Sequence, residues 1–412
     1  MSSKRNLPAR VTAAMTRAIS FGITGLLLPA RLEAERGCPE PSDVRTVLVV
    51  RADEIGDVVM TSPFLRELRR NLTTARISLV VKPEVRNLVE HCPYVDEILT
   101  FDWSTSTYWW PLQNYLRAAR FAQEQLMARR FDLAIVPRWD TDWYHASFIA
   151  HFSRARYRLG YAESVNARKQ RFNRGYDHLF SHTIFDDRPR HEVERGLALL
   201  AYLGWPIASD RLELWTTPED EAFADQVLKN AGIRADETLI AFGIGARHAR
   251  RKWPVERFAE LGQCLRAQYP CRILVTGDRS DAALAVALRS RLDGTVIDMA
   301  GRTTLRQSAA LFKRCRLFIG NDSGPKHIAA AAGVPIVEIS WCSYGSRSSA
   351  NSTVNRFRPW DVPHRIVSPH RPIVPCAEEC TAAESHCIRG VTVEMMQEAI
   401  RGELSSSRGP GS

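Results

Sequence analysis

Short apolar runs alternate with segments of helical character along most of the chain. The runs are rich in Val, Ile and Leu and have the length of buried parallel strands. Because strands that alternate with helices favour a parallel sheet covered on both faces, the pattern predicts a doubly wound α/β fold. The expected strands are Thr46–Val50, Ile77–Val81, Glu97–Phe101, Asp132–Val136, Thr238–Phe242, Arg272–Thr276, Thr295–Asp298, Leu317–Ile319 and Ile336–Ile339.

The chain is long enough for two domains. Its 412 residues exceed the size at which a single core usually stops growing. A helical pattern over His191–Leu203 ends at Gly204-Trp205-Pro206, so we expect a junction after it. The predicted parts are an extension at 1–44, a Rossmann-like domain at 45–205, a junction at 206–236, a second Rossmann-like domain at 237–372, a Cys-containing tail with a helix at 373–404 and a disordered tail at 405–412.

A strand, a polar turn and a helix follow one another in the second predicted domain. Leu317–Ile319 precedes the turn Asp322–Gly324, and the small residues Ile328–Ala332 favour a helix packed closely on a sheet. The first N–H groups of a helix lack intrahelical partners and carry partial positive charge, so this turn could hold a phosphate. An ordinary helix cap, with His327 packed behind it, is the alternative.

A second turn of this kind follows the first predicted strand. Thr46–Val50 leads into Arg51-Ala52-Asp53-Glu54-Ile55-Gly56-Asp57, and ligands of open α/β sheets gather at the carboxyl ends of the strands. Asp57 is therefore expected where a catalytic carboxylate would act, and Ser62-Pro63 is expected to cap and begin a helix. Alternatively, Asp53 and Glu54 are solvated turn residues and Asp57 caps a short turn. The segment lacks G-x-G-x-x-G, which disfavours dinucleotide binding.

A strongly basic loop connects a strand to a helix in the second predicted domain. It runs from Gly243 to Trp253, and phosphate is the natural counterpart of its charge. Arg251 and Lys252 are the candidates for a phosphate contact. Solvated positions are the alternative for its other basic side chains.

Composition and charge agree with an enzyme that handles anions. The formal net charge is +10 and the isoelectric point is near 9.3, which suits a nucleotide diphosphate, a phosphorylated glycolipid or an acidic membrane. A basic surface without special function is the alternative. Nucleic acid is not expected as a partner, because the chain has no zinc-finger spacing, RNA-binding aromatic signature or dominant Lys/Arg block.

Residues 1–44 are basic and carry the apolar stretch Ile19–Leu28. Ten residues cannot span a bilayer, which needs about 20. Contact with the membrane surface, a secretory signal near Leu28-Pro29-Ala30, and a plain helix packed on the first domain all fit the pattern. We favour surface contact over a signal because two glycines interrupt the stretch.

The nine cysteines are too sparse for a disulfide scaffold and fit a reducing compartment. Four residues near the C-terminal end have a spacing, C-x3-C-x5-H-C, that could surround a zinc ion. The spacing matches no standard zinc module, so packed thiols are the favoured interpretation and no metal is assigned. The four residues are Cys376, Cys380, His386 and Cys387.

Taken together, these segments resemble glycosyltransferase family 9, whose best-known members are the ADP-heptose:lipopolysaccharide heptosyltransferases. The resemblance spans about residues 45–403 and implies a GT-B fold, two Rossmann-like domains facing across a cleft. It rests on VLVVRADEIGDVVMTSPFLRELR near the start of the first domain, KWPVERFAELGQCL at 252–265, ILVTGD at 273–278, the run from 298 to 335 that contains NDSGPKH, and the Cys-containing tail near 376–390.

The resemblance also implies the chemistry. Members act in the cytoplasm, without a cofactor, and transfer a sugar from a nucleotide diphosphate to a lipopolysaccharide-core or related glycan with inversion. By position, Asp57 is the expected catalytic base. The expected donor-binding residues are Arg251, Lys252, Asp322, Ser323, Gly324 and His327, and the acceptor-side candidates are Arg51, Gly56, Arg138 and Asp140.

Two features leave the substrates open. Relatives carry a lysine two residues before Trp253, where this chain has Arg251, and the sequence after Pro335 departs from the usual heptosyltransferase pattern. Another donor sugar is therefore an alternative. So are a nucleotide-sugar epimerase on the same architecture and a non-catalytic sugar-phosphate binding protein.

Overall fold

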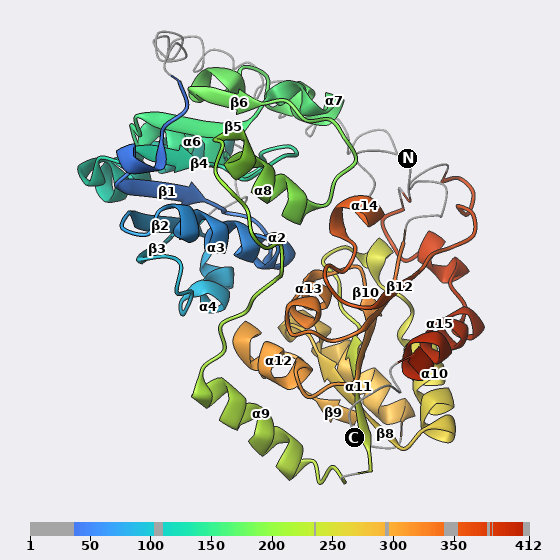
Figure 1. Ribbon diagram of the computed structural model, residues 1–412. Helices are drawn as coiled ribbons and strands as arrows, with labels where there is room; N and C mark the ends of the chain where they lie inside the picture. The colour runs from blue at the N-terminus through green and yellow to red at the C-terminus, as the bar shows by residue number, and fades with distance from the viewer. Residues whose placement is uncertain are drawn as a thin grey trace. The chain divides into compact units, whose positions relative to one another are not determined.

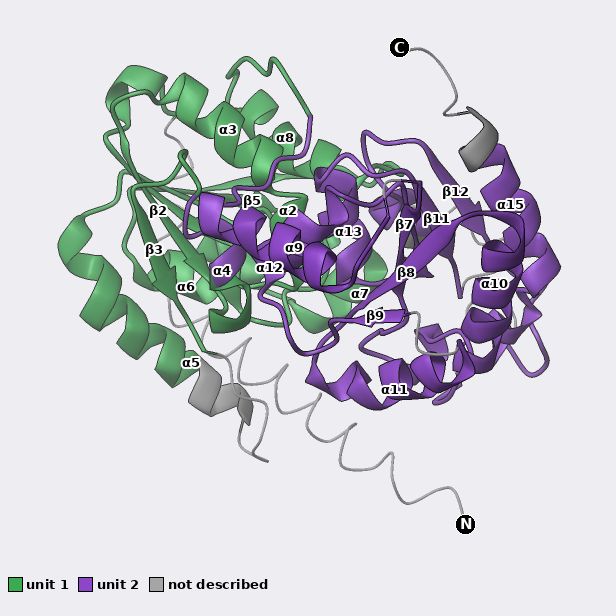
Figure 2. Cartoon of the chain, turned by 90° about the horizontal axis from the view of Figure 1, so that it is seen from below, with its two compact units in different colours: residues 1–86, 92–210 green, residues 87–91, 211–412 purple. Residues whose placement is uncertain are grey.

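The computed structural model describes residues 37–102, 110–234, 236–292, 296–341, 353–376, 380 and 382–406. Most of the predicted extension, at 1–36, and the last six residues of the predicted disordered tail lie outside the described residues. The described chain forms two compact units (Figure 2). One comprises the described residues up to Arg86 with Cys92–Asp210, and the other comprises Asn87–His91 with the described residues from Arg211 onward.

The first unit is built on a six-stranded parallel sheet with the order β3-β2-β1-β4-β5-β6. Its strands are β1 (Thr46–Val50), β2 (Arg76–Val81), β3 (Glu97–Thr100), β4 (Leu133–Ile135), β5 (Tyr157–Tyr161) and β6 (His182–Ile184). Its helices are α2 (Ile55–Val59), α3 (Ser62–Asn71), α5 (Trp110–Phe121), α6 (Ala146–Phe152), α7 (Ala167–Phe172) and α8 (Glu192–Tyr202), and α4 (Arg86–Val89) begins at the unit's boundary.

Helices cover both faces of this sheet, which explains its uninterrupted apolar strands. Because side chains alternate along a strand, Leu48 and Val50 point to one face, where they share a core with Tyr115 of α5 and Phe148 of α6. The equally buried Val47 and Val49 point to the opposite face, where α3 and α8 pack on each other (Figure 1).

The second unit repeats the same plan. Its six parallel strands have the order β12-β11-β10-β7-β8-β9. The strands are β7 (Thr238–Gly243), β8 (Cys271–Thr276), β9 (Val296–Asp298), β10 (Leu317–Asn321), β11 (Ile336–Ile339) and β12 (His364–Val367). The helices are α9 (Pro218–Asn230), α10 (Val255–Gln268), α11 (Ala282–Arg291), α12 (Leu305–Phe312), α13 (Gly324–Ala331), α14 (Thr353–Phe357) and α15 (Val393–Ser406).

The C-terminal tail contributes to the core of the second unit. Ile388 and Met396 are buried with Phe258 of α10 and Leu288 of α11 on one face of the sheet. On the other face α12 packs on α13, and Phe312 meets Phe318 of β10 edge to face with ring centroids 5.4 Å apart (Figure 1). Each unit is thus a three-layer Rossmann-like structure.

The predicted fold class is confirmed, and the predicted strands in the described residues are found within one or two residues of their expected ends. The helix expected over His191–Leu203 is α8, with His191 as its cap and Gly204 after its end in the left-handed conformation. Ser62 was predicted to cap α3, which is wrong by one residue. Thr61 holds the cap position, and the Ser62 hydroxyl donates to the Val59 carbonyl instead.

No helix among the described residues is both long enough and apolar enough to cross a membrane.

Candidate active site

The strand order places the two predicted motifs at equivalent points of the two sheets. In each sheet, successive strands are added first on one side of the first strand and then on its other side. The change of side falls between β1 and β4 in the first unit and between β7 and β10 in the second. Ligands of doubly wound sheets bind at the carboxyl ends of such strands. Asp57 follows β1 and Arg138 follows β4, while Arg251 follows β7 and Asp322 follows β10.

Two arginines hold the carboxylate of Asp57. It lies on α2, the first helical turn after β1, and its side chain is 13% exposed. Arg51 Nη2 lies 3.3 Å from Asp57 Oδ1, and Arg138 Nη1 lies 4.0 Å from Asp57 Oδ2. Both arginines also contact Asp53, at 3.2 and 2.7 Å respectively. Asp53 is thus a buried organising carboxylate rather than a solvated turn residue.

The surroundings of Asp57 raise its pKa. Burial penalises the charged carboxylate and is the largest cause. Arg51 and Arg138 work in the opposite direction, whereas the neighbouring carboxylates of Asp53 and Glu192 add to the increase. A raised pKa makes a carboxylate a stronger base, and the partial exposure leaves this one accessible to a substrate.

The other acceptor-side candidates differ in what they contact. Gly56 is buried inside α2, next to Asp57. Asp140 is buried, and its Oδ1 accepts hydrogen bonds from the Thr141 N–H at 2.7 Å and from Asn166 at 3.3 Å. The carboxylate of Asp142 accepts the N–H groups at the start of α6. This segment is therefore a structural turn, and Arg51 and Arg138 are the acceptor-side candidates that reach Asp57.

In the second unit, Ser323 stands before the first residue of α13 without capping it. Its backbone is extended, and its hydroxyl donates to the Asn321 carbonyl at 3.3 Å instead of accepting a helix N–H. The alternative interpretation, that the Ser323 side chain caps the helix, is thus wrong. The eight residues of α13 begin at Gly324 and include the buried His327. The helix N-terminus has the character that binds phosphate.

Asp322 is enclosed by positive and polar partners. Lys326 Nζ lies 2.5 Å from its Oδ1, Arg251 Nη1 lies 3.7 Å from its Oδ2, and the Trp341 indole N–H donates to Oδ2 at 3.2 Å. Burial would raise the pKa of this carboxyl, but the two cations hold it down to about 2. Asp322 is therefore ionised and neutralised by its neighbours.

Arg251 and Lys252 have different partners. Lys252 Nζ lies 3.0 Å from the carboxylate of Asp281. Arg251 lies over the Trp341 ring, with its guanidinium 5.0 Å from the ring centroid, and shares Asp322 with Lys326. Asp322 is paired more closely with Lys326 than with Arg251. The positive charge of Arg251 is therefore less fully neutralised and can attract an incoming anion.

Several residues that the sequence did not single out complete this arrangement. The buried amide of Asn321 accepts the Trp253 N–H at 3.0 Å and donates to the Ile244 carbonyl at 2.8 Å, which ties the basic loop to the start of α13. Lys326 also reaches Glu338 of β11 at 2.9 Å. The sequence held one signal for this pair: Lys326 interrupts an apolar helix and Glu338 interrupts an apolar strand. Because buried charges are normally paired, the two residues could have been predicted to meet.

The four tail residues converge although the sequence favoured packed thiols without a metal. The ligand atoms of Cys376, Cys380, His386 and Cys387 all lie within 4.8 Å of one another.

Comparisons with known proteins agree with this geometry. The model of glycosyltransferase family 9 (heptosyltransferase) matches residues 119–386, more than half of the chain. The chain belongs to glycosyltransferase family 9. It is a glycosyltransferase, as predicted. The family match begins after Asp57, so the role of that residue is not settled by it.

Several curated relatives of the glycosyltransferase are heptosyltransferases. The lipopolysaccharide core heptosyltransferase OpsX of Haemophilus influenzae is 21% identical over 295 residues, covering 71% of this chain and 78% of the relative. The lipooligosaccharide heptosyltransferase 2 of Haemophilus ducreyi is 25% identical over 303 residues, covering 70% and 80%.

Solved structures share the fold of the glycosyltransferase. A family 9 glycosyltransferase from Veillonella parvula has a TM-score of 0.71 at 20% identity, covering 88% of this chain and 98% of the other. The ADP-heptose lipopolysaccharide heptosyltransferase II of E. coli has a TM-score of 0.63 at 18% identity, covering 88% and 100%. The likeness identifies the pair of Rossmann-like units as the GT-B fold.

Proposed function

We propose that this glycosyltransferase moves heptose from ADP-heptose to a lipopolysaccharide-core acceptor, with inversion and without a metal ion in the transfer step. The observation that carries the proposal is the carboxylate of Asp57, largely buried after the carboxyl end of β1 with a raised pKa. A transferase needs such a base, because a sugar hydroxyl is a weak nucleophile.

Asp57 would accept the proton of the attacking hydroxyl. As that oxygen bonds to the anomeric carbon, the bond from this carbon to the diphosphate breaks and the nucleotide leaves with the electron pair. Direct displacement from the opposite side inverts the anomeric configuration. General-base assistance of this kind contributes about 10²- to 10⁴-fold. Arg51 and Arg138 would keep the carboxylate oriented and ionised until the acceptor arrives.

The second unit would bind the donor diphosphate. The N–H groups at Ser323 and Gly324 and the guanidinium of Arg251 are the groups that could stabilise the charge of the leaving phosphate. Asp322 would act as a positioning residue, because it holds Arg251 from one side and Lys326 from the other. These fixed charges would serve where other transferases use a metal ion, and this supports the metal-independent mechanism.

The relatives supply the choice of substrates. Structures that share the fold include the E. coli heptosyltransferase WaaC with ADP, at a TM-score of 0.60 and 16% identity. Together with the two Haemophilus heptosyltransferases, it supports ADP-heptose as the donor and a lipopolysaccharide-core glycan as the acceptor. We place the enzyme in the cytoplasm, on the inner face of the membrane that carries the acceptor. None of the eight described cysteines forms a disulfide bond, which agrees with a reducing compartment.

The proposal is tested by offering the purified full chain ADP-, GDP- and UDP-sugars with extracted bacterial glycolipids and measuring nucleotide release. We expect release from ADP-heptose only when a lipopolysaccharide-core acceptor is present. Release or rearrangement of the sugar without an acceptor would favour an epimerase or hydrolase. Binding of a donor without turnover on any acceptor would favour a sugar-phosphate binding protein.

Two neighbouring variants test the assignment of the donor site. Arg251→Gln should raise the Kd for ADP about tenfold, a loss typical of one charge-assisted contact. Lys252→Gln is the matched control and should have a smaller effect, because Asp281 already pairs with that lysine. The opposite ranking would assign the phosphate contact to Lys252.

A further inference from the structure

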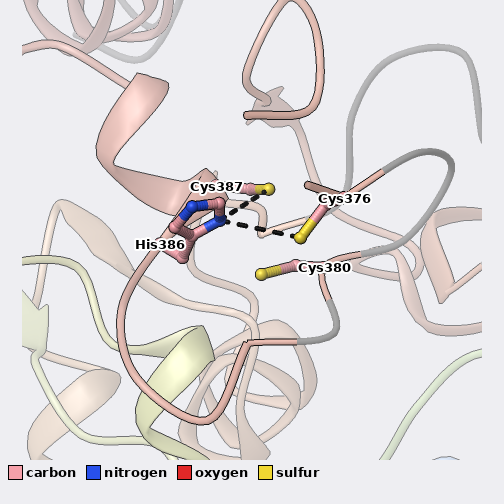
Figure 3. Close-up of side chains that lie close together, drawn as sticks. All are labelled: Cys376, Cys380, His386 and Cys387. Atoms are coloured by element: carbon pink, nitrogen blue, oxygen red, sulfur yellow. Dashed lines mark hydrogen bonds between the residues drawn. The ribbon is translucent and has the colours of Figure 1, made fainter. Parts of the chain in front are cut away.

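Three thiols and one imidazole meet in the tail that precedes α15. Two of the thiols belong to Cys376 and Cys380. The imidazole of His386 and the third thiol, of Cys387, follow Cys380 after five intervening residues. All four ligand atoms lie within 4.8 Å of one another, and the side chains point toward a common centre (Figure 3). The proposed transfer chemistry does not use these residues.

Two of the separations are close to the edges of a coordination tetrahedron. His386 Nδ1 lies 3.6 Å from Cys376 Sγ and 3.4 Å from Cys387 Sγ. Around zinc, with sulfur at about 2.3 Å and nitrogen at about 2.0–2.1 Å, tetrahedral geometry separates the ligand atoms by about 3.5–3.8 Å. A disulfide would instead bring two sulfur atoms to about 2.05 Å, and none forms here.

The cluster is built into the core rather than lying on the surface. Cys380 and Cys387 are 4% and 1% exposed and belong to the same buried cluster as Ile388 and Val391. The backbone N–H of Ile373 donates to Cys387 Sγ at 3.4 Å. Such a contact fixes the direction in which the sulfur points, as outer hydrogen bonds do for metal ligands.

We propose that Cys376, Cys380, His386 and Cys387 bind one structural zinc ion. Three cysteines and one histidine form one of the sets that structural zinc sites use, and thiolate sulfur selects zinc over the hard cations magnesium and calcium. Because the protein supplies all four ligands, no position remains for substrate or water. The ion therefore has no part in the transfer chemistry, and the proposed function does not depend on it.

A zinc ion here would hold a segment that has little regular structure of its own. Between β12 and α15 the described residues form only the short helix η11 (Cys387–Gly390). The segment therefore has few helix or sheet hydrogen bonds to stabilise it. Metal binding would stabilise it instead, because the free energy of metal binding contributes to the free energy of folding.

The site also connects to the donor side of the unit. The Val391 carbonyl, four residues after Cys387, accepts the Trp253 indole N–H at 2.9 Å. The backbone N–H of Trp253 in turn donates to Asn321, which precedes α13. Metal binding would thus stabilise the residues that orient the basic loop and the helix N-terminus.

The test is metal content in the untagged full chain, purified under reducing conditions without chelators. Elemental analysis should give one zinc per chain for the native protein and for the control Cys315→Ser, a buried cysteine outside the cluster. Cys380→Ser and Cys387→Ser should lose it. One iron per chain would overturn the choice of zinc, and absence of metal after incubation with zinc would overturn the site.

A second measurement keeps the test valid if the cysteine variants fail to fold. Cobalt(II) added to the metal-depleted native chain should give the intense visible bands of a tetrahedral thiolate site. Addition of zinc should remove these bands and protect three thiols from a thiol reagent. Weak octahedral cobalt bands, or equal thiol reactivity with and without zinc, would show that the cysteines are merely packed.

Discussion

At the residue scale, function depends on carboxylates whose neighbours set their protonation. Asp57 has its pKa raised chiefly by burial, whereas Asp322 is held ionised by Lys326 and Arg251. The sequence identified both carboxylates from their positions after strands. It did not identify their pairing. Arg138 follows β4 and meets Asp57 only in the folded unit, whereas Lys326 lies four residues after Asp322 and was missed.

Arg138 provides a test of the base at this scale. Its charge lowers the pKa of Asp57, so Arg138→Gln should raise that pKa further. Since the base must be ionised, activity falls as pH drops through its pKa. The acid limb of the pH profile of kcat/KM should therefore move to higher pH in the variant. Arg120→Gln, which removes an exposed arginine of α5, should leave the limb in place, and an unmoved limb in Arg138→Gln would contradict the assignment.

Glu338 gives a prediction on stability. Its pKa is raised to about 7, chiefly by burial, and Asp322 adds to the increase against the opposing charge of Lys326. Between the usual value of 4.5 and about 7 the folded state holds a proton that the unfolded state has lost. The contribution of Glu338 to the free energy of unfolding should therefore decrease as pH rises through this window. Asp322 does not interfere, because its contribution is lost only as pH falls from 3.8 toward 2.

Glu338→Gln should remove this contribution, so the free energy of unfolding should fall less with pH than in the native chain, as measured by urea unfolding at pH 4.5, 5.5, 6.5 and 7.5. Glu260→Gln replaces an exposed glutamate of α10 in the same unit and should leave the slope unchanged. The same pH dependence in Glu338→Gln as in the native chain would contradict the assignment to Glu338.

At the element scale, close contact between strands fixes the donor site. Gly320 of β10 lies opposite Gly243 of β7. A Cβ on Gly320 would lie 2.8 Å from the Gly243 carbonyl oxygen and 2.9 Å from its Cα, too close for backbone atoms that cannot turn aside. Glycine at both positions lets the strands end side by side where the basic loop and α13 begin.

Gly320→Ala should therefore destabilise the protein by about 1–3 kcal/mol, the usual cost of overpacking. Gly402→Ala is the matched control in α15, where the nearest atom lies 3.9 Å from the added Cβ and alanine is the better helix former. Denaturant unfolding of the two variants checks the difference. Equal stabilities would mean that the strands can separate without cost.

At the scale of the whole molecule, the two units repeat one plan, so the motifs of Asp57 and Asp322 each follow a central strand of a sheet. Central strands such as β1 and β10 are buried on both faces, so their apolar runs were plain in the sequence. Three strands of the sheets were missed. β5 includes the buried Arg158, whose guanidinium donates to backbone carbonyls. β6 and β12 are short edge strands, each of which contains a histidine. A search for apolar runs misses a strand that contains polar side chains, even where those side chains find hydrogen-bond partners in the folded unit.

The most direct test of the central claim is the kcat of Asp57→Asn with ADP-heptose and a lipopolysaccharide-core acceptor. Asparagine keeps the shape of the side chain but cannot accept the proton, so kcat should fall by about 10²- to 10⁴-fold. The Kd for ADP should stay within about twofold, and Glu124→Gln, an exposed control on the first unit, should keep native activity. A kcat within a few-fold of the native value would show that Asp57 is not the base.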